Sequence, residues 1–177
     1  RETAIKDAET TFDDGTFLSD LRNLVSYATE SQDPASGPVL RRYLDDAMRP
    51  WLEGMGYSCQ VMDNPQPQFG PFLLAERIED TSLPTVLTYG HGDVVGGQDD
   101  RWQEGLDPWT LTQKGDRLYG RGTADNKGQH AINMTALRTI IKSRGKLGFN
   151  SKILIETGEE TGSPGLAELF QEKADLF

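Results

Sequence analysis

The chain contains 177 residues, with 28 acidic and 18 basic side chains and a formal net charge of −10. This length is enough for one ordinary domain with its own hydrophobic core. The negative charge repels phosphate backbones and anionic lipid head groups, so we expect neither nucleic acid nor a membrane surface as a partner.

Two further features lead us to expect a soluble, cytoplasmic protein. No apolar run approaches the ~18 residues of a membrane span, and the first ten residues, RETAIKDAET, lack the apolar core of a signal peptide. The single cysteine, Cys59, cannot form a disulfide within the chain. The alternating pattern around Cys59 predicts a small core residue on a strand, in a reducing compartment.

The first half of the chain predicts two helices followed by three strands. Apolar residues recur at helical spacing over residues 17–28 and again over residues 39–52, and Gly54 and Gly56 end the second pattern. Polar and proline-rich segments then separate three short strand candidates, at residues 57–62, 72–78 and 85–90.

The second half predicts a hairpin, two helices and one more strand. The hairpin turns at residues 114–116, a helix follows over residues 127–143, and an apolar strand lies at 152–156. Gly145 ends the helix. Ser163 and Pro164 predict the N-cap and first position of a last helix.

This order of elements predicts an α/β fold, with a mostly parallel sheet and helices packed on it. Such sheets place ligand sites at the carboxyl ends of their strands. Three predicted strand ends are followed by residue types that bind metal ions. These residues are His91 and Asp93, then Asp125, then Glu159 and Glu160. We expect all five to lie at one edge of the sheet.

Imidazole and carboxylate ligands together suit zinc, and one carboxylate can bridge two ions about 3.5 to 4 Å apart. Asp125 is the natural bridging residue. His91 and Asp93 are two residues apart in an extended segment, so Asp93 can fix the imidazole tautomer without binding metal itself. Glu159 and Glu160 are adjacent and leave the backbone in different directions, so one can bind metal while the other acts as a base.

Each of these patterns also has a structural explanation. An isolated H-x-D is more often a capped turn, and a pair of glutamates is more often solvated charge. The segment GRGTAD does not fit a dinucleotide fingerprint, because Asp125 stands where a glycine is needed. His130 lies within the predicted helix and is expected to have a structural role.

Taken in order, the segments GHGDVV, DPWTLTQKGDRLYGRGTADNKG and GEETGSPG resemble the signature blocks of one enzyme family. This is the family of co-catalytic zinc peptidases and amidohydrolases that includes carnosinase, cytosolic dipeptidases, aminoacylase, acetylornithine deacetylase and succinyl-diaminopimelate desuccinylase. The resemblance runs from about the first predicted helix to the last residue.

The resemblance implies a role for each of the five residues. His91 would bind one zinc, Asp125 would bridge two zinc ions, and Glu160 would bind the second, with cobalt or manganese as possible substitutes. Asp93 would orient His91. Glu159 would be the general base that activates water for attack on an amide carbonyl. A cis peptide bond after Asp125 is also implied.

Two parts of the family pattern have no counterpart in these residues. The family uses a further acidic ligand and a further histidine ligand, and it inserts a second domain that closes the site and often forms a homodimer. We therefore expect residues 1–177 to be the N-terminal part of a catalytic domain. The 177-residue chain alone is expected to be inactive.

The resemblance implies hydrolysis of a dipeptide or short peptide with a free carboxylate. The alternative within the family is deacylation of an N-acyl amino acid, such as acetylornithine. An alternative of a different class is a non-catalytic metal-binding or interaction fragment.

Overall fold

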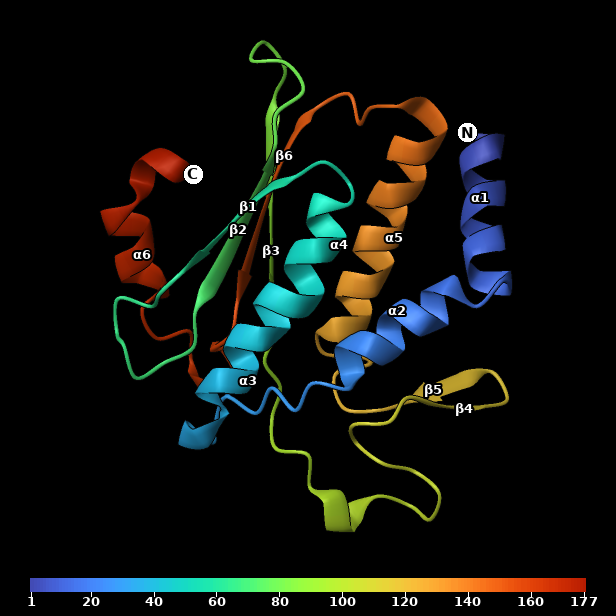
Figure 1. Cartoon of the computed structure of the whole chain (residues 1–177), viewed down its shortest axis with the longest axis vertical. Coiled ribbons are helices and arrows are strands. Elements are labelled where there is room, and N and C mark those ends of the chain that lie inside the picture. Colours follow the sequence, from blue (N-terminus) through green and yellow to red (C-terminus); the bar gives the residue numbers. More distant parts are fainter.

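A four-stranded sheet forms the centre of the fold in the computed structural model, which describes residues 1–177 (Figure 1). The strands lie in the order β1-β2-β6-β3. Their bounds are β1 Ser58–Met62, β2 Phe72–Arg77, β6 Asn150–Glu156 and β3 Thr85–His91.

The predicted α/β fold, with helices packed on a sheet, is confirmed, but the sheet is mixed and not mostly parallel. β1 pairs with β2 and β2 pairs with β6 in antiparallel orientation, whereas only β3 and β6 are parallel. The short loop between β1 and β2 allows an antiparallel pair. β3 and β6 are instead joined by a long connection that contains a helix, as parallel neighbours require.

Helices cover both faces of this sheet, as Figure 1 shows. The helices are α1 Glu2–Asp13, α2 Thr16–Val25, α3 Gly37–Arg42, α4 Arg49–Glu53, α5 Lys127–Arg144 and α6 Leu166–Glu172. A π-helical stretch, Tyr43–Met48, joins α3 to α4. Short 3-10 turns lie at Pro34–Ser36, Asp99–Arg101, Glu159–Thr161 and Ala174–Leu176.

The core is divided between the two faces of the sheet. Along β2, Leu73 and Ala75 belong to the larger cluster, which also contains residues of α2, α4 and α5. Phe72 and Leu74 point to the opposite face and pack with Leu169 of α6. Because successive strand residues alternate between faces, a strand covered on both sides needs an uninterrupted apolar run. This requirement explains the sequence FLLA in β2.

Most elements lie where the sequence predicts them. The hairpin consists of β4 Thr112–Lys114 and β5 Arg117–Tyr119, and α5 is followed by Gly145 with a left-handed backbone. Cys59 lies in β1 and packs against the larger core. Helix α1 was not predicted, and it contains no fully buried residue.

The predicted start of the last helix is wrong. Ser163 does not cap α6, because its backbone is left-handed (φ 54°) and the helix begins only after Gly165. The Ser163 hydroxyl instead donates a hydrogen bond to Glu156, 2.8 Å away. A serine followed by proline therefore marks a turn here and not a helix N-terminus.

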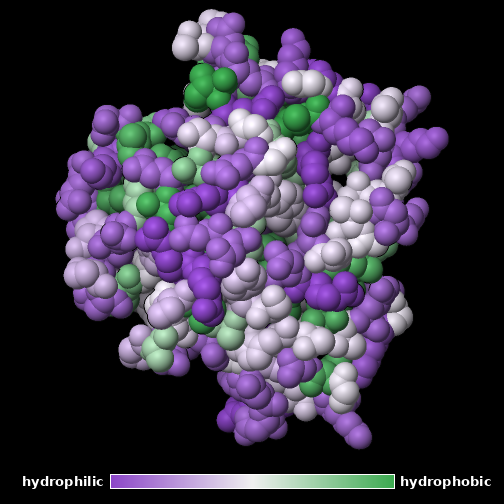
Figure 2. All heavy atoms as spheres, in the orientation of Figure 1, coloured by the Kyte–Doolittle hydropathy of each residue, from purple (hydrophilic) through white to green (hydrophobic).

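The visible surface is largely polar (Figure 2). Hydrophilic side chains cover most of this face, and apolar residues appear in small separated groups. No helix in the structure combines the length and the apolar character that crossing a membrane requires.

Candidate metal centre

The candidate site lies where β3 and β6 end. The two strands are parallel, and His91 of β3 is the register partner of Glu156 of β6. A hydrogen bond from the Gly92 amide to the Glu156 carbonyl, 2.8 Å long, continues the pairing past the end of β3. The segments that follow the two strands therefore leave the sheet at the same edge, as the sequence predicts.

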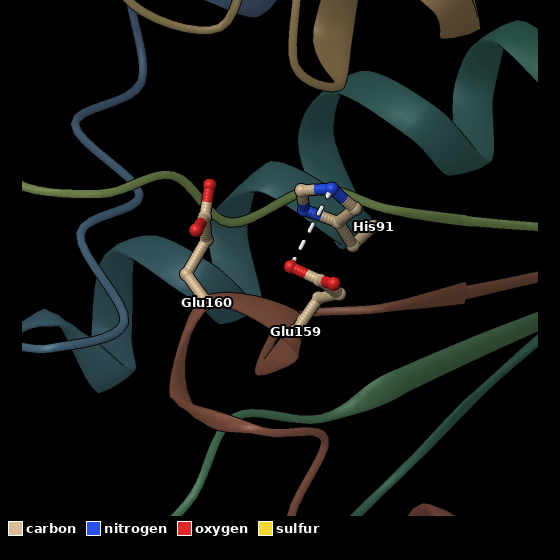
Figure 3. Close-up of side chains that lie close together, drawn as sticks. All are labelled: His91, Glu159 and Glu160. Atoms are coloured by element: carbon tan, nitrogen blue, oxygen red, sulfur yellow. Dashed lines mark ion pairs between the residues drawn. The ribbon is translucent and has the colours of Figure 1, made fainter.

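Four side chains with metal-binding atoms meet at this edge. His91 Nε2 lies 3.0 Å from Asp125 Oδ1 and 4.0 Å from Glu159 Oε2. His91, Glu159 and Glu160 each present a ligand atom, and these atoms lie within 4.8 Å of one another (Figure 3). Asp125 comes from the loop before α5, so three separate segments of the chain supply the cluster.

Asp93 lies behind this cluster and is completely buried. Its carboxylate accepts hydrogen bonds from the Ser31 hydroxyl at 2.6 Å, the Glu159 amide at 3.2 Å and the Glu160 amide at 3.1 Å. His91 Nδ1 is 3.4 Å from the same carboxylate and 3.1 Å from the Asp93 backbone carbonyl. Asp93 therefore contacts His91 as predicted and also holds the turn that carries both glutamates.

The contacts to the two glutamate amides could not be read from the sequence. Their donors are backbone groups more than 60 positions away along the chain, and a backbone amide leaves no residue-specific signal. The segment between His91 and Asp93 is closely packed at Gly92. A Cβ atom there would lie 2.3 Å from the Tyr43 ring.

Charges in the cluster favour a bound cation. Burial alone would lower the pKa of His91, but the Asp93 and Asp125 carboxylates raise it to about 9. Burial raises the pKa of Glu160, and the neighbouring Asp125 charge raises it further. Several carboxylates thus face a single imidazolium, which can neutralise only one of their negative charges. A divalent cation would relieve that repulsion, so the donor set fits a metal ion.

The second histidine has the structural role expected from the sequence. His130 is buried in α5, and its Nε2 lies within hydrogen-bonding distance, 2.9 Å, of the His91 carbonyl. Burial lowers the pKa of His130 to about 4, so the ring is neutral and donates this hydrogen bond. It supports the backbone that carries His91, and its Nε2 is not available as a ligand.

The segment around Asp125 contains two further features. The Asp125–Asn126 peptide bond is cis, as the family resemblance implies. Lys127 is completely buried, and its ammonium donates a 2.6 Å hydrogen bond to the Tyr27 carbonyl and lies 5.2 Å from the centre of the Tyr43 ring. Sequence reasoning missed Lys127, because a lysine at the start of a helix is normally solvated.

Comparison with known proteins identifies the family. Residues 87–177, about half of the chain, match the family described as Peptidase family M20/M25/M40. Beta-Ala-His dipeptidase of Mus musculus is 36% identical over 91% of this chain and 34% of the mouse protein. Acetylornithine deacetylase of Proteus mirabilis is 35% identical over 85% of this chain and 37% of that enzyme.

Solved structures agree with the sequence comparison. The fold superposes on human carnosine dipeptidase 1 with a TM-score of 0.87 and 30% identity, covering 98% of this chain and 38% of the human one. The dipeptidase Dug1p of Saccharomyces cerevisiae shares the fold, with a TM-score of 0.84 at 23% identity over 98% of this chain and 38% of the yeast chain. The chain spans about a third of the length of these relatives. The signature segments, the fold and the family match together show that this chain belongs to peptidase family M20/M25/M40.

Proposed function

We propose that this chain carries the metal-binding part of the active site of a hydrolase that cleaves the amide bond of a dipeptide or short peptide with a free carboxylate. The observation that carries the proposal is the convergence of His91, Asp125, Glu159 and Glu160 at one sheet edge. The dipeptidases among the similar proteins support the substrate class.

In this proposal, His91, Asp125 and Glu160 would hold two zinc ions, and Asp125 would contribute to both. Zinc would supply Lewis acidity and would lower the pKa of water from 15.7 toward about 7. Asp93 keeps His91 and the glutamate turn in place, since its buried carboxylate bonds to both glutamate amides and lies next to the imidazole.

Glu159 is the proposed general base. Its side chain is 45% exposed and approaches His91 Nε2 only to 4.0 Å, so its carboxylate is free to take a proton from the attacking water. It would then pass that proton to the leaving amine. Glu159 and Glu160 both reach the cluster, and their different roles are therefore the part of the proposal that most needs a test.

We also propose that residues 1–177 form the N-terminal part of a catalytic domain. His91, Asp125 and Glu160 give each of two ions only two protein ligands, whereas zinc sites use three or four. The missing ligands and a domain that closes the site would lie elsewhere in a longer, homodimeric enzyme. The free thiol of Cys59 supports a cytoplasmic location.

Deacylation of an N-acyl amino acid is the second candidate function, favoured by the similarity to acetylornithine deacetylase. Both reactions hydrolyse an amide and could use the same metal centre. Steady-state kinetics of the intact enzyme with β-alanyl-histidine and with N-acetylornithine would distinguish them. A kcat/KM at least tenfold higher for the dipeptide, a difference of about 1.4 kcal/mol, supports the first proposal, and the reverse order supports the second.

Substitution of the paired glutamates tests the site itself. In the intact enzyme, Glu159→Gln should lower kcat by roughly 100-fold or more while the zinc content stays unchanged, because only the base is lost. Glu160→Gln should lower the zinc content. Equal loss of zinc in both variants would contradict the assignment of Glu159 as the base.

A further inference from the structure

A buried carboxyl group that plays no part in the proposed chemistry lies beside the metal centre. Glu156, the last residue of β6, is completely buried. Its Oε1 atom accepts hydrogen bonds from the Tyr89 hydroxyl and from the Ser163 hydroxyl. Tyr89 lies on β3 two residues before His91, and Ser163 follows the turn that carries Glu159 and Glu160. One oxygen atom therefore connects two of the three segments that build the site.

The conformation of the loop depends on this contact. Gly162 and Ser163 both have left-handed backbones, with φ angles of 90° and 54°. Glycine adopts this conformation freely, but serine is disfavoured in it. The Ser163 amide donates a 2.9 Å hydrogen bond to the Gly158 carbonyl, which closes the loop, and its hydroxyl attaches the closed loop to Glu156.

Glu156 itself does not belong to the metal-binding cluster. The ligand atoms that converge come from His91, Glu159 and Glu160. Glu156 Oε1 already has two donors, and Oε2 is buried with no hydrogen-bond partner. Burial raises the pKa of Glu156, since an ionised carboxylate with an unpartnered oxygen is costly in this position. Its contacts in the structure are the two hydrogen bonds that Oε1 accepts.

The turn is thus held from two sides. Asp93 accepts hydrogen bonds from the backbone amides of Glu159 and Glu160. Glu156 holds the far end of the same turn through Ser163. We propose that Glu156 is a positioning residue, which fixes the turn bearing Glu159 and Glu160 against the end of β3 that bears His91. The expected effect of Glu156 on metal binding rests on the proposed function, whereas the effect of Glu156 on the turn does not.

Two substitutions of Glu156 separate hydrogen bonding from bulk. Glutamine keeps an oxygen that can accept both hydroxyl groups, and leucine fills a similar volume without an acceptor. In Glu156→Leu, amide hydrogen exchange over residues 157–165 should become about tenfold faster, the factor expected for the loss of the one hydrogen bond that attaches this loop, from Ser163. Zinc titrated into the same variant should bind about tenfold more weakly. In Glu156→Gln both values should stay within about threefold of the wild type.

A matched control removes a hydrogen bond from the other end of the same strand. The Tyr57 hydroxyl donates to the Ser151 hydroxyl at 2.9 Å, near the start of β6. Tyr57→Phe should lower the melting temperature without changing exchange over 157–165 or zinc affinity. Ser163→Ala should reproduce the effects of Glu156→Leu, and it replaces that variant if the leucine protein does not fold.

Wild-type exchange over 157–165 in Glu156→Leu, or in Ser163→Ala, would overturn the proposal. So would a glutamine variant as impaired as the leucine variant, because the hydrogen-bond acceptor would then not be the relevant property. If zinc fails to bind the wild-type protein, the proposed function is contradicted, and the exchange rates alone decide the positioning role.

Discussion

Replacing Asp93 with asparagine should destabilise the fold strongly, although the two side chains have nearly the same shape. The buried carboxylate accepts hydrogen bonds at both oxygens, from Ser31 and the Glu160 amide at Oδ2 and from the Glu159 amide at Oδ1. Asparagine has only one such oxygen. Whichever way its amide is oriented, its NH2 group faces at least one backbone amide that can only donate.

The size of the effect follows from these contacts. A hydrogen bond to a charged group contributes about 1.5 to 3 kcal/mol, and a buried donor left without a partner adds a penalty of its own. We expect Asp93→Asn to lower the free energy of unfolding by about 2 to 4 kcal/mol, a large share of the 5 to 15 kcal/mol typical of a domain. Ser31→Ala, which removes one hydroxyl donor, should cost only about 1 kcal/mol.

Urea unfolding of the metal-free chain, followed by circular dichroism, measures both variants against the wild type. A change of less than about 0.5 kcal/mol for Asp93→Asn, the size of an ordinary surface substitution, would refute this account of the Asp93 contacts. An equal loss in Asp93→Asn and Ser31→Ala would show that the glutamate amides do not depend on Asp93.

Two further predictions concern residues that support the site. Burial holds the pKa of His130 at about 4, below its ordinary value of 6.5. As the pH falls, the unfolded chain therefore takes up the proton before the folded chain does. The contribution of His130 to stability is complete above pH 6.5 and is lost as the pH falls toward 4. Wild type should lose on the order of 3 kcal/mol more than His130→Gln between pH 7 and 4 in urea unfolding, and parallel pH profiles would contradict this. A Cβ atom at Gly128 would lie 1.9 Å from the Thr123 carbonyl, whereas one at Gly37 would meet nothing within 4 Å. Gly128→Ala should therefore cost about 3 kcal/mol or more and Gly37→Ala almost nothing, and equal melting temperatures would count against the packing described here.

The sequence predicts much of the fold because most elements bury a regular apolar pattern. β2 contains the apolar run FLLA and β6 the apolar run ILI, and α5 ends at a glycine with a left-handed backbone. Strand direction follows a different principle. Nothing in the apolar run of β2 distinguishes an antiparallel neighbour from a parallel one, so the mixed sheet was not foreseen.

The site was predictable where a side chain follows directly after a strand. His91 ends β3, and Glu159 follows β6 by three residues, so sheet geometry alone brings them to one edge. Glu156 and Lys127 were missed for a common reason. Both are charged residue types that lie completely buried, and the groups that accommodate them, Ser163 and the Tyr27 carbonyl, become neighbours only in the folded chain.

The position of bound zinc would show whether these residues form the metal centre. Crystals of the intact protein grown with zinc, measured at the zinc absorption edge, would locate the ions by their anomalous signal. We expect two peaks about 3.5 to 4 Å apart, both within about 2.2 Å of Asp125 oxygens, with His91 on one ion and Glu160 on the other. Zinc bound away from these residues, or coordinated by Glu159 in place of Glu160, would contradict it.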